Sequence, residues 1–423
     1  MNALVAVVVA AILNVAILVL LRKRYHPEVY DVLAKTYLAS ICIRYLLAGF
    51  LWLNYENPQF NSMFWGDSYK YDMIGASIAN EWSHGYASST WRETIEGKTN
   101  AGFVYVVASV YYVFGHNVLL MQFLNGVIGT LVSVVVFEIA LLLYDRGVAT
   151  RAMLLTTFFP QMMFWSCAIY KDPLVMLCAG LNILAVLRLR ERFQLHFFVI
   201  YLLSALAALS LRFYLFYIIL AATVCTFFLG RARDLRTTFV VQLLFMASFV
   251  GLILFTPVGE AVRTQQIFFD LEQLQVSRSD LASAASGFTY EADVSTPLGA
   301  LQVLPLGIVY ILLAPFPWTL TNLRQLLVLP DVLVWYALMP ALFRGLSRAF
   351  RNRFAITMPI LMFTTSLTIA YAMFLGNAGT AYRQRTQVMM FYFLFIADGM
   401  RQRRRQEASA EPSSPSPLPA PSA

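Results

Sequence analysis

The residues best suited to chemistry begin with Asp67, which follows the aromatic pair Phe64 and Trp65 in the polar stretch 55–100. Aromatic neighbours lower the local polarity, so we expect the pKa of the Asp67 carboxyl group to be raised. Such a carboxylate can act as a general base that takes a proton from a hydroxyl group. A structural role is the alternative, because aspartate is also favoured as the N-cap of a helix that begins at the next residue. Asp72 follows soon after and, on a helix, would point away from Asp67.

Charged residues also stand where long apolar segments meet. Lys171 and Asp172 precede a segment that starts at Pro173. A helix that starts there presents free amides and the positive end of its dipole, which together with a lysine suit a phosphate group. Arg212 interrupts the apolar stretch Leu195–Leu229, and a charge in such a place indicates a functional site. Anchoring at the membrane interface is the structural alternative for these residues.

Two arginines, Arg383 and Arg385, adjoin a glycine-rich turn at 376–384. Guanidinium groups make forked contacts with a phosphate or a pyrophosphate, so we favour an anion-binding role for both. The sequence has no glycine-rich nucleotide loop and no motif of a zinc protease or serine hydrolase. Its four cysteines lie in apolar stretches without paired spacing, so neither a disulfide framework nor a cysteine-based metal site is expected. Carboxylates combined with cations suit a lipid phosphate donor and a hydroxyl acceptor.

The elements that must position these residues are membrane-spanning helices. Of the 423 residues, 59% are hydrophobic and 13% are charged, whereas a soluble domain has about a quarter charged residues. Many apolar runs are near the ~20 residues that a helix needs to cross the hydrocarbon core. Because backbone amides in lipid must be paired internally, these unbroken runs favour helices. The sequence therefore predicts an all-α polytopic bundle of about ten to twelve spans.

The net charge of +8 arises from basic clusters between the apolar runs. This arrangement is typical of cytoplasmic loops and does not indicate nucleic-acid binding. The clusters that we assign to the cytoplasm are Arg22–Arg24, Arg146/Arg151, Arg188/Arg190/Arg192, Arg231/Arg233/Arg236, Arg344/Arg348/Arg351/Arg353 and Arg401/Arg403–Arg405. The spans that follow are 3–21, 36–54, 118–143, 150–169, 173–188, 195–211, 213–229, 236–256, 328–343, 354–375 and 385–400.

The remaining segments complete the predicted organisation. Residues 1–405 form one transmembrane domain, and the Pro/Ser/Ala-rich segment 406–423 is a disordered cytoplasmic tail. The loops 55–117 and 257–298 lie on the outer face, where residues 101–115 form a short surface helix.

One segment does not fit the alternation of spans. A single crossing by 299–316 would put the cluster Arg344–Arg353 on the outer side. Pro315 and Pro317 break helices. We therefore interpret 299–327 as a re-entrant or interfacial element, and a full extra span is the alternative.

The order of these residues resembles the GT-C class of multi-spanning glycosyltransferases that use lipid-linked sugars, in particular bacterial mannosyltransferase-like members. The resemblance covers roughly residues 60–230, and beyond them it rests on the turn 383–385. The residues that carry it are Asp67-Ser68-Tyr69, Ile78-Ala79, Gly102-Phe103, Phe114-Gly115-His116-Asn117, Leu124-Asn125-Gly126, the turn Arg146–Arg151, Phe159-Pro160 and Lys171-Asp172.

This resemblance implies an inverting transfer from a polyprenyl-phosphate sugar to a lipid-linked or cell-envelope glycan, at the periplasmic face of a bacterial inner membrane. Asp67 would be the base, and the residues that would bind the substrate or its phosphate are Tyr69, Asp72, Lys171, Asp172, Arg212, Arg383 and Arg385. Some members of the family use a divalent metal ion, but this sequence has no evident cluster of metal ligands.

Two alternatives remain open. A repeat-unit polymerase would use the same arginines on an undecaprenyl-pyrophosphate glycan. A carrier or assembly scaffold for glycolipids belongs to a different class, and a carrier is expected to show inverted repeats and charges buried at mid-span. The sequence shows no convincing example of either feature.

Overall fold

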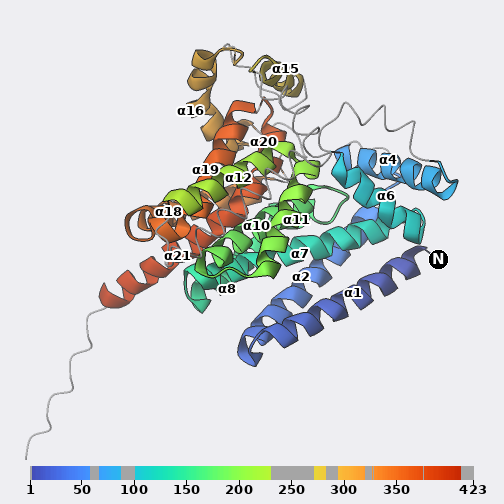
Figure 1. Ribbon diagram of the computed structural model, residues 1–423, viewed down its shortest axis with the longest axis horizontal. Coiled ribbons are helices and arrows are strands. Elements are labelled where there is room, and N and C mark those ends of the chain that lie inside the picture. Colours follow the sequence, from blue (N-terminus) through green and yellow to red (C-terminus); the bar gives the residue numbers. More distant parts are fainter. Residues whose placement is uncertain are drawn as a thin grey trace, which may run out of the picture.

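The computed structural model describes residues 2–57, 66–86, 101–229, 271–282, 294–319, 326, 328–374 and 376–410. Within these ranges every regular element is a helix, which confirms the predicted all-α class (Figure 1). Six of the helices are long and apolar enough to cross a membrane, judged by length and composition. They are α1 (Asn2–Arg24), α2 (Pro27–Leu53), α7 (Val118–Leu143), α10 (Asp172–Glu191), α18 (Leu329–Asn352) and α19 (Phe354–Phe374).

Helix α7 forms the centre of the N-terminal half. It packs against α1, α2, α10 and α8 (Arg146–Phe158), and most of its side chains are buried. The Asn117 side chain begins α7 by accepting a hydrogen bond from the Leu120 amide, and Asp145 begins α8 in the same way. Both residues satisfy amides that a helix start leaves without partners.

Helix α21 (Thr386–Ala410) forms the centre of the C-terminal half. It packs against α8 and α18, and the side chains from Val388 to Ala397 are all buried. Gly345 of α18 lies against the backbone of Phe395, and Gly399 lies against Ala341. A side chain at either glycine would push the two helices apart. The shorter apolar helices α11 (Leu195–Leu211) and α12 (Phe213–Leu229) pack beside α10 and α19.

Two short helices, α4 (Gly66–Ser83) and α6 (Gly102–Phe114), pack against each other at the end of the bundle where α1 begins (Figure 1). Gly75 of α4 lets Val107 of α6 approach closely, and Gly102 lies against Ser210 of α11. We call this the site end. The helix predicted for 101–115 is present, at 102–114.

Five of the predicted cytoplasmic clusters gather at the opposite end, which we call the basic end. Glu138 pairs with Arg24 at 3.0 Å and with Arg188 at 3.3 Å, which joins two of these clusters. The ion pairs that complete the group are Arg146–Glu28, Arg348–Asp398 and Arg401–Asp145. The cluster Arg231/Arg233/Arg236 lies outside the described residues.

Several predicted bounds differ from the ends of the helices in the structure. The span 150–169 is two helices, because Pro160 ends α8 at Phe158 and begins α9 (Pro160–Trp165). Helix α18 continues past 343 to Asn352, and α21 continues to Ala410, so the boundary predicted at 406 falls inside a helix. Part of the outer loop 257–298 is helix α15 (Leu271–Ala282). The span 236–256 and residues 411–423 lie outside the described residues.

Helix α16 (Pro297–Leu313) occupies much of the segment that did not fit the alternation. Gly307 lies against the backbone of Ala372, near the end of α19. The Leu312 carbonyl accepts a hydrogen bond from the Trp335 indole at 2.7 Å, and Trp335 lies near the beginning of α18. These contacts join α16 to neighbouring helices near the site end. A re-entrant or interfacial role for 299–327 stays a prediction.

Candidate active site

Helix α4 brings Asp67 to the turn between α9 and α10. Asp67 lies in the first turn of α4. The next residue, Ser68, is buried, and its Oγ accepts a hydrogen bond from the Ile169 amide at 3.0 Å. This contact fixes the start of α4 beside the turn that carries Lys171.

Hydrogen bonds from α7 hold the turn between α9 and α10 in place. Asn125 Nδ2 donates hydrogen bonds to the carbonyls of Ala168 at 2.6 Å and Tyr170 at 2.8 Å. Lys171 follows, and its Nζ donates to the Leu211 carbonyl at 3.2 Å. Because Asn125 is fully buried, the backbone that presents Lys171 is fixed by groups that cannot exchange freely with water.

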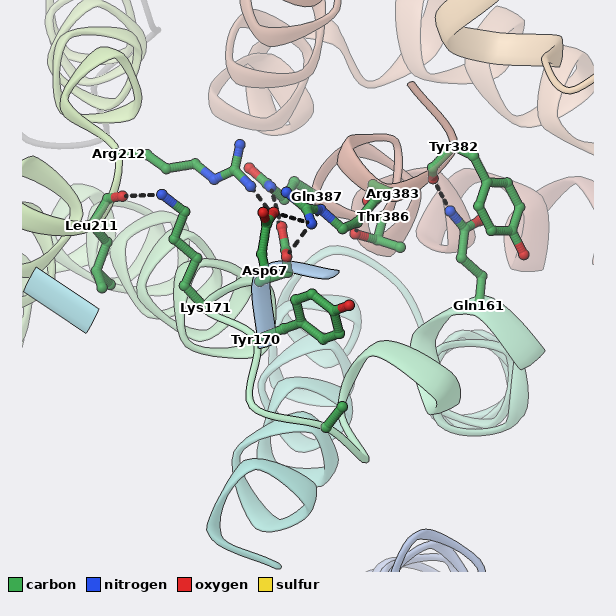
Figure 2. A network of polar contacts seen from close by, with 12 residues as sticks. Asp67, Gln161, Tyr170, Lys171, Leu211, Arg212, Tyr382, Arg383, Thr386 and Gln387 are labelled. Atoms are coloured by element: carbon green, nitrogen blue, oxygen red, sulfur yellow. Dashed lines mark hydrogen bonds and ion pairs between the residues drawn. The ribbon is translucent and has the colours of Figure 1, made fainter. Parts of the chain in front are cut away.

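Arg383 comes from α20 (Ala378–Gln384), a short helix where a glycine-rich turn was predicted. The Asn377 side chain accepts hydrogen bonds from the Gly379 and Thr380 amides, which lets the helix form. Gln161 of α9 donates to the Tyr382 carbonyl, and Thr386 donates to the Arg383 carbonyl at 2.8 Å (Figure 2). The backbone on both sides of Arg383 is therefore held in place.

Arg383 links two carboxylates. Its Nη1 donates to Asp67 Oδ2 at 2.7 Å (Figure 2). Its Nε lies 3.5 Å from Asp172 Oδ2. The guanidinium carbon also lies 5.5 Å from the centre of the Tyr170 ring, a cation–π distance. Arg383 thus joins α4 to α10, although the residues are far apart in the sequence.

Asp172 is fully buried and belongs to a closed ring of polar side chains. Its Oδ1 accepts from Arg212 Nη2 at 2.7 Å and from Gln387 Nε2 at 3.2 Å. Tyr371 donates to Gln387 Oε1 at 2.7 Å and lies 3.2 Å from the Tyr214 hydroxyl. Arg212 closes the ring by donating to the Tyr214 hydroxyl at 2.6 Å. The ring fixes Asp172 and Arg212 and leaves Arg383 as the more exposed arginine of the group.

The electrostatics differ from the expectation for Asp67. Burial raises the pKa of the Asp67 carboxyl group, but the charge and hydrogen bond of Arg383 outweigh burial and hold the pKa below its ordinary value. The predicted raised pKa is wrong, because that expectation left out the arginine that α20 supplies. Burial, reinforced by the charge of Arg212, lowers the pKa of the Lys171 amino group to about 7. The site therefore holds an ionised carboxylate and a lysine that titrates near neutral pH.

Three of the predicted site residues lie away from this group. The Tyr69 ring is exposed, and its centre is 6.1 Å from that of Tyr55. Asp72 is buried among tyrosines and a histidine on another side of α4, as its spacing from Asp67 indicated. Arg385 is fully buried and donates to the carbonyls of Leu312 and Ala314, each at 3.0 Å, at the end of α16.

Sequence reasoning missed four residues that shape the site. Gln387 had a usable signal, since it is an amide near the start of an apolar span. Tyr170, Tyr214 and Tyr371 had none, because aromatic residues are frequent throughout this chain. Their hydroxyl and ring contacts depend on how four helices meet.

A divalent metal ion does not fit the carboxylates of this site. Among the described residues no group of three histidine, cysteine or acidic side chains could hold one. Asp67 and Asp172 are both engaged by arginines, and Lys171 adds a third basic residue. These residues instead suit an anion that binds to the basic side chains and a proton that is transferred to Asp67.

Comparisons with known proteins agree with the resemblance found in the sequence. Residues 101–259 match a sequence model of the family described as dolichyl-phosphate-mannose-protein mannosyltransferase. That match overlaps the stretch of roughly 60–230 in which the GT-C motifs lie, and it supports a GT-C type of glycosyltransferase. No curated protein matches the chain significantly.

Solved structures that are similar include two from the archaeon Archaeoglobus fulgidus. One is an oligosaccharyltransferase in the apo form, with a TM-score of 0.49, 14% identity, and coverage of 88% of this chain and 52% of that chain. Another is the oligosaccharyltransferase AglB in complex with an inhibitory peptide and a dolichol-phosphate, with a TM-score of 0.48, 15% identity, and coverage of 89% and 52%. The chain spans about half the length of these structures.

Proposed function

We propose that this protein transfers a sugar from a polyprenyl-phosphate donor to a hydroxyl group of a glycan or glycolipid acceptor. The observation that carries the proposal is the pairing of a candidate base, Asp67, with a cation suited to a phosphate, Arg383, at 2.7 Å. Lys171 and Arg212 add positive charge beside them. The match of 101–259 to a mannosyltransferase family supports the same chemistry.

The reaction that fits these groups is an inverting displacement. The acceptor oxygen forms a bond to the anomeric carbon of the sugar, while the bond from that carbon to the phosphate oxygen breaks. The electron pair leaves with the polyprenyl phosphate, and the hydroxyl proton moves to the Asp67 carboxylate. Arg383 must first turn from Asp67 toward the phosphate, because a carboxylate oxygen held by a guanidinium is a poor proton acceptor.

The charges of the site favour a monophosphate donor over a pyrophosphate. Asp67 and Asp172 supply two negative charges, and Lys171, Arg212 and Arg383 supply three positive charges when the lysine is protonated. The surplus of one matches a sugar phosphodiester. After transfer Asp67 is neutral and the surplus is two, which matches a phosphate monoester that carries a charge of about −1.5 to −2. A pyrophosphate donor would exceed the surplus from the start, which argues against the polymerase.

The basic end supports an outer-face location for the site. Lysine and arginine are concentrated in cytoplasmic loops, and the ion pairs of Arg24, Arg188 and Arg401 lie at the end opposite α4 and α6. We infer that the site end faces the periplasm of a bacterial inner membrane. The sugar, whether hexose or pentose, is to be identified by trial of donors.

The experiment that tests the proposal is replacement of the base. Asp67→Asn keeps the side-chain size but cannot accept the proton, so transfer from labelled polyprenyl-phosphate sugars in membranes should fall by about 10²–10⁴-fold. Asp31→Asn is the matched control, because Asp31 is exposed and pairs only with the nearby Lys35 in the structure as described. Full transfer by Asp67→Asn with none by Asp172→Asn would move the base to Asp172. Full transfer by both would refute both carboxylates as the base, and an effect of the arginines alone would then favour the polymerase or the carrier.

A further inference from the structure

A second buried cluster surrounds Asp72, on another side of the helix that carries Asp67. Asp72 is 2% exposed. Its Oδ1 accepts hydrogen bonds from the Tyr111 hydroxyl at 2.5 Å and from His116 Nε2 at 2.9 Å, and its Oδ2 accepts from the Tyr55 hydroxyl. The reaction proposed above uses none of these groups.

The three donors to Asp72 come from three different parts of the bundle. Tyr55 follows the end of α2, Tyr111 belongs to α6, and His116 lies in the link between α6 and α7. That link is itself fixed, because Asn117 begins α7 and its Nδ2 donates to the Asn2 carbonyl at 2.7 Å. One carboxylate therefore ties α4 to α2, α6 and the start of α7.

We propose that Asp72 is a positioning residue that holds α4, and with it Asp67, on the site end, and that protonation of His116 strengthens this hold. A buried carboxylate needs hydrogen bonds or an opposite charge to be stable. His116 is the one donor of the three that changes charge near neutral pH, and its side chain is 54% exposed, so protons reach it from solvent. Among the residues that the structure describes, the titratable groups that face the cluster are Tyr55, Tyr111 and His116, with Tyr69 beside Tyr55.

The direction of the pH effect follows from the two partners. The hydrogen bond to Asp72 raises the pKa of His116, although burial opposes this. Burial raises the pKa of Asp72, but the hydrogen bonds from His116, Tyr111 and Tyr55 bring it below its ordinary value. The stabilisation of α4 by protonated His116 is therefore complete below the ordinary histidine pKa of about 6.5. It is lost as the pH rises through the raised pKa of His116. At acidic pH the same stabilisation is lost as the pH falls through the lowered pKa of Asp72.

Hydrogen–deuterium exchange of the full-length protein in detergent tests this proposal without any substrate. After correction for intrinsic exchange, we expect the amides of segment 66–83 in the wild type to exchange faster at pH 8.5 than at pH 6. The ratio of the two rates should reach up to about tenfold for each unit by which the pKa of His116 is raised. In His116→Gln this difference should disappear. His84→Gln is the matched control, because His84 bonds only to nearby Ser83 and Asn80 in the contacts that the structure describes.

A second variant keeps the test decisive. Asp72→Asn removes the charge that distinguishes the two protonation states of His116, so 66–83 should exchange fast at both pH values. An unchanged pH difference in His116→Gln, or an equal loss in His84→Gln, would overturn the proposal. Because these measurements concern α4 alone, they stand or fall independently of the glycosyl transfer.

Discussion

Replacing Arg383 separates its two proposed roles, binding the donor phosphate and pairing with Asp67. A hydrogen bond to a charged group contributes about 1.5–3 kcal/mol. Because about 1.4 kcal/mol corresponds to a tenfold change in affinity, Arg383→Gln should weaken donor binding by about 10- to 150-fold. Arg383→Lys keeps the charge but cannot reach Asp67 and Asp172 together as the guanidinium does. We expect Arg383→Lys to weaken donor binding less than Arg383→Gln does.

The same substitution changes Asp67 in a definite direction. Arg383 holds the pKa of Asp67 below its ordinary value, against the effect of burial. Without this arginine the pKa of Asp67 rises, so the acidic limb of kcat/KM, which reports groups of the free enzyme, should move to higher pH. Binding is thus weakened while the carboxylate becomes a stronger base.

The assay is the KM of a polyprenyl-phosphate sugar and the inhibition constant of polyprenyl phosphate, each measured across pH. Arg22→Gln is the control, since Arg22 lies at the basic end of α1 and should leave both constants unchanged. If Arg383→Gln alters neither the KM nor the acidic limb, Arg383 binds no phosphate and the coupling to Asp67 is refuted.

Two further predictions concern neighbouring cations. Arg385→Lys should lower the stability by about 1–3 kcal/mol, because it loses carbonyl contacts at the end of α16; thermal unfolding in detergent should show this, with the donor KM unchanged. Polyprenyl phosphate should bind more tightly at pH 6 than at pH 8, because burial, together with the charge of Arg212, lowers the pKa of Lys171 to about 7 and the amine is charged only below it. Lys171→Gln should remove that dependence, and a pH-independent inhibition constant in the wild type would contradict it.

Three apolar helices were predictable because polar residues bound their apolar runs. The predicted spans 118–143, 195–211 and 213–229 coincide with α7, α11 and α12. Asn117 precedes the first of these runs, and Arg212 separates the other two. The break between α8 and α9 was missed because the run 150–169 stays apolar through Phe159. Pro160 acts there through the backbone, which hydropathy does not report.

The site was partly predictable for a related reason. Alternating spans place Asp67, Lys171, Arg212 and Arg383 on the same face of the membrane, and the structure brings all four to the site end. What alternation cannot predict is which carboxylate meets which cation. That pairing depends on α20, a helix of seven residues where a flexible turn was expected.

The two arginines of the predicted fork show how local geometry decides such a question. Arg383 and Arg385 are two positions apart, and the backbone at both is helical. Since each helical residue turns by about 100°, their side chains point to nearly opposite sides. Arg383 accordingly reaches Asp67, whereas Arg385 turns toward the carbonyls of Leu312 and Ala314. On an extended turn, a two-residue spacing would favour the binding of one anion by both arginines. Because Asn377 starts a helix instead, the same spacing directs Arg383 to the site and Arg385 to the end of α16.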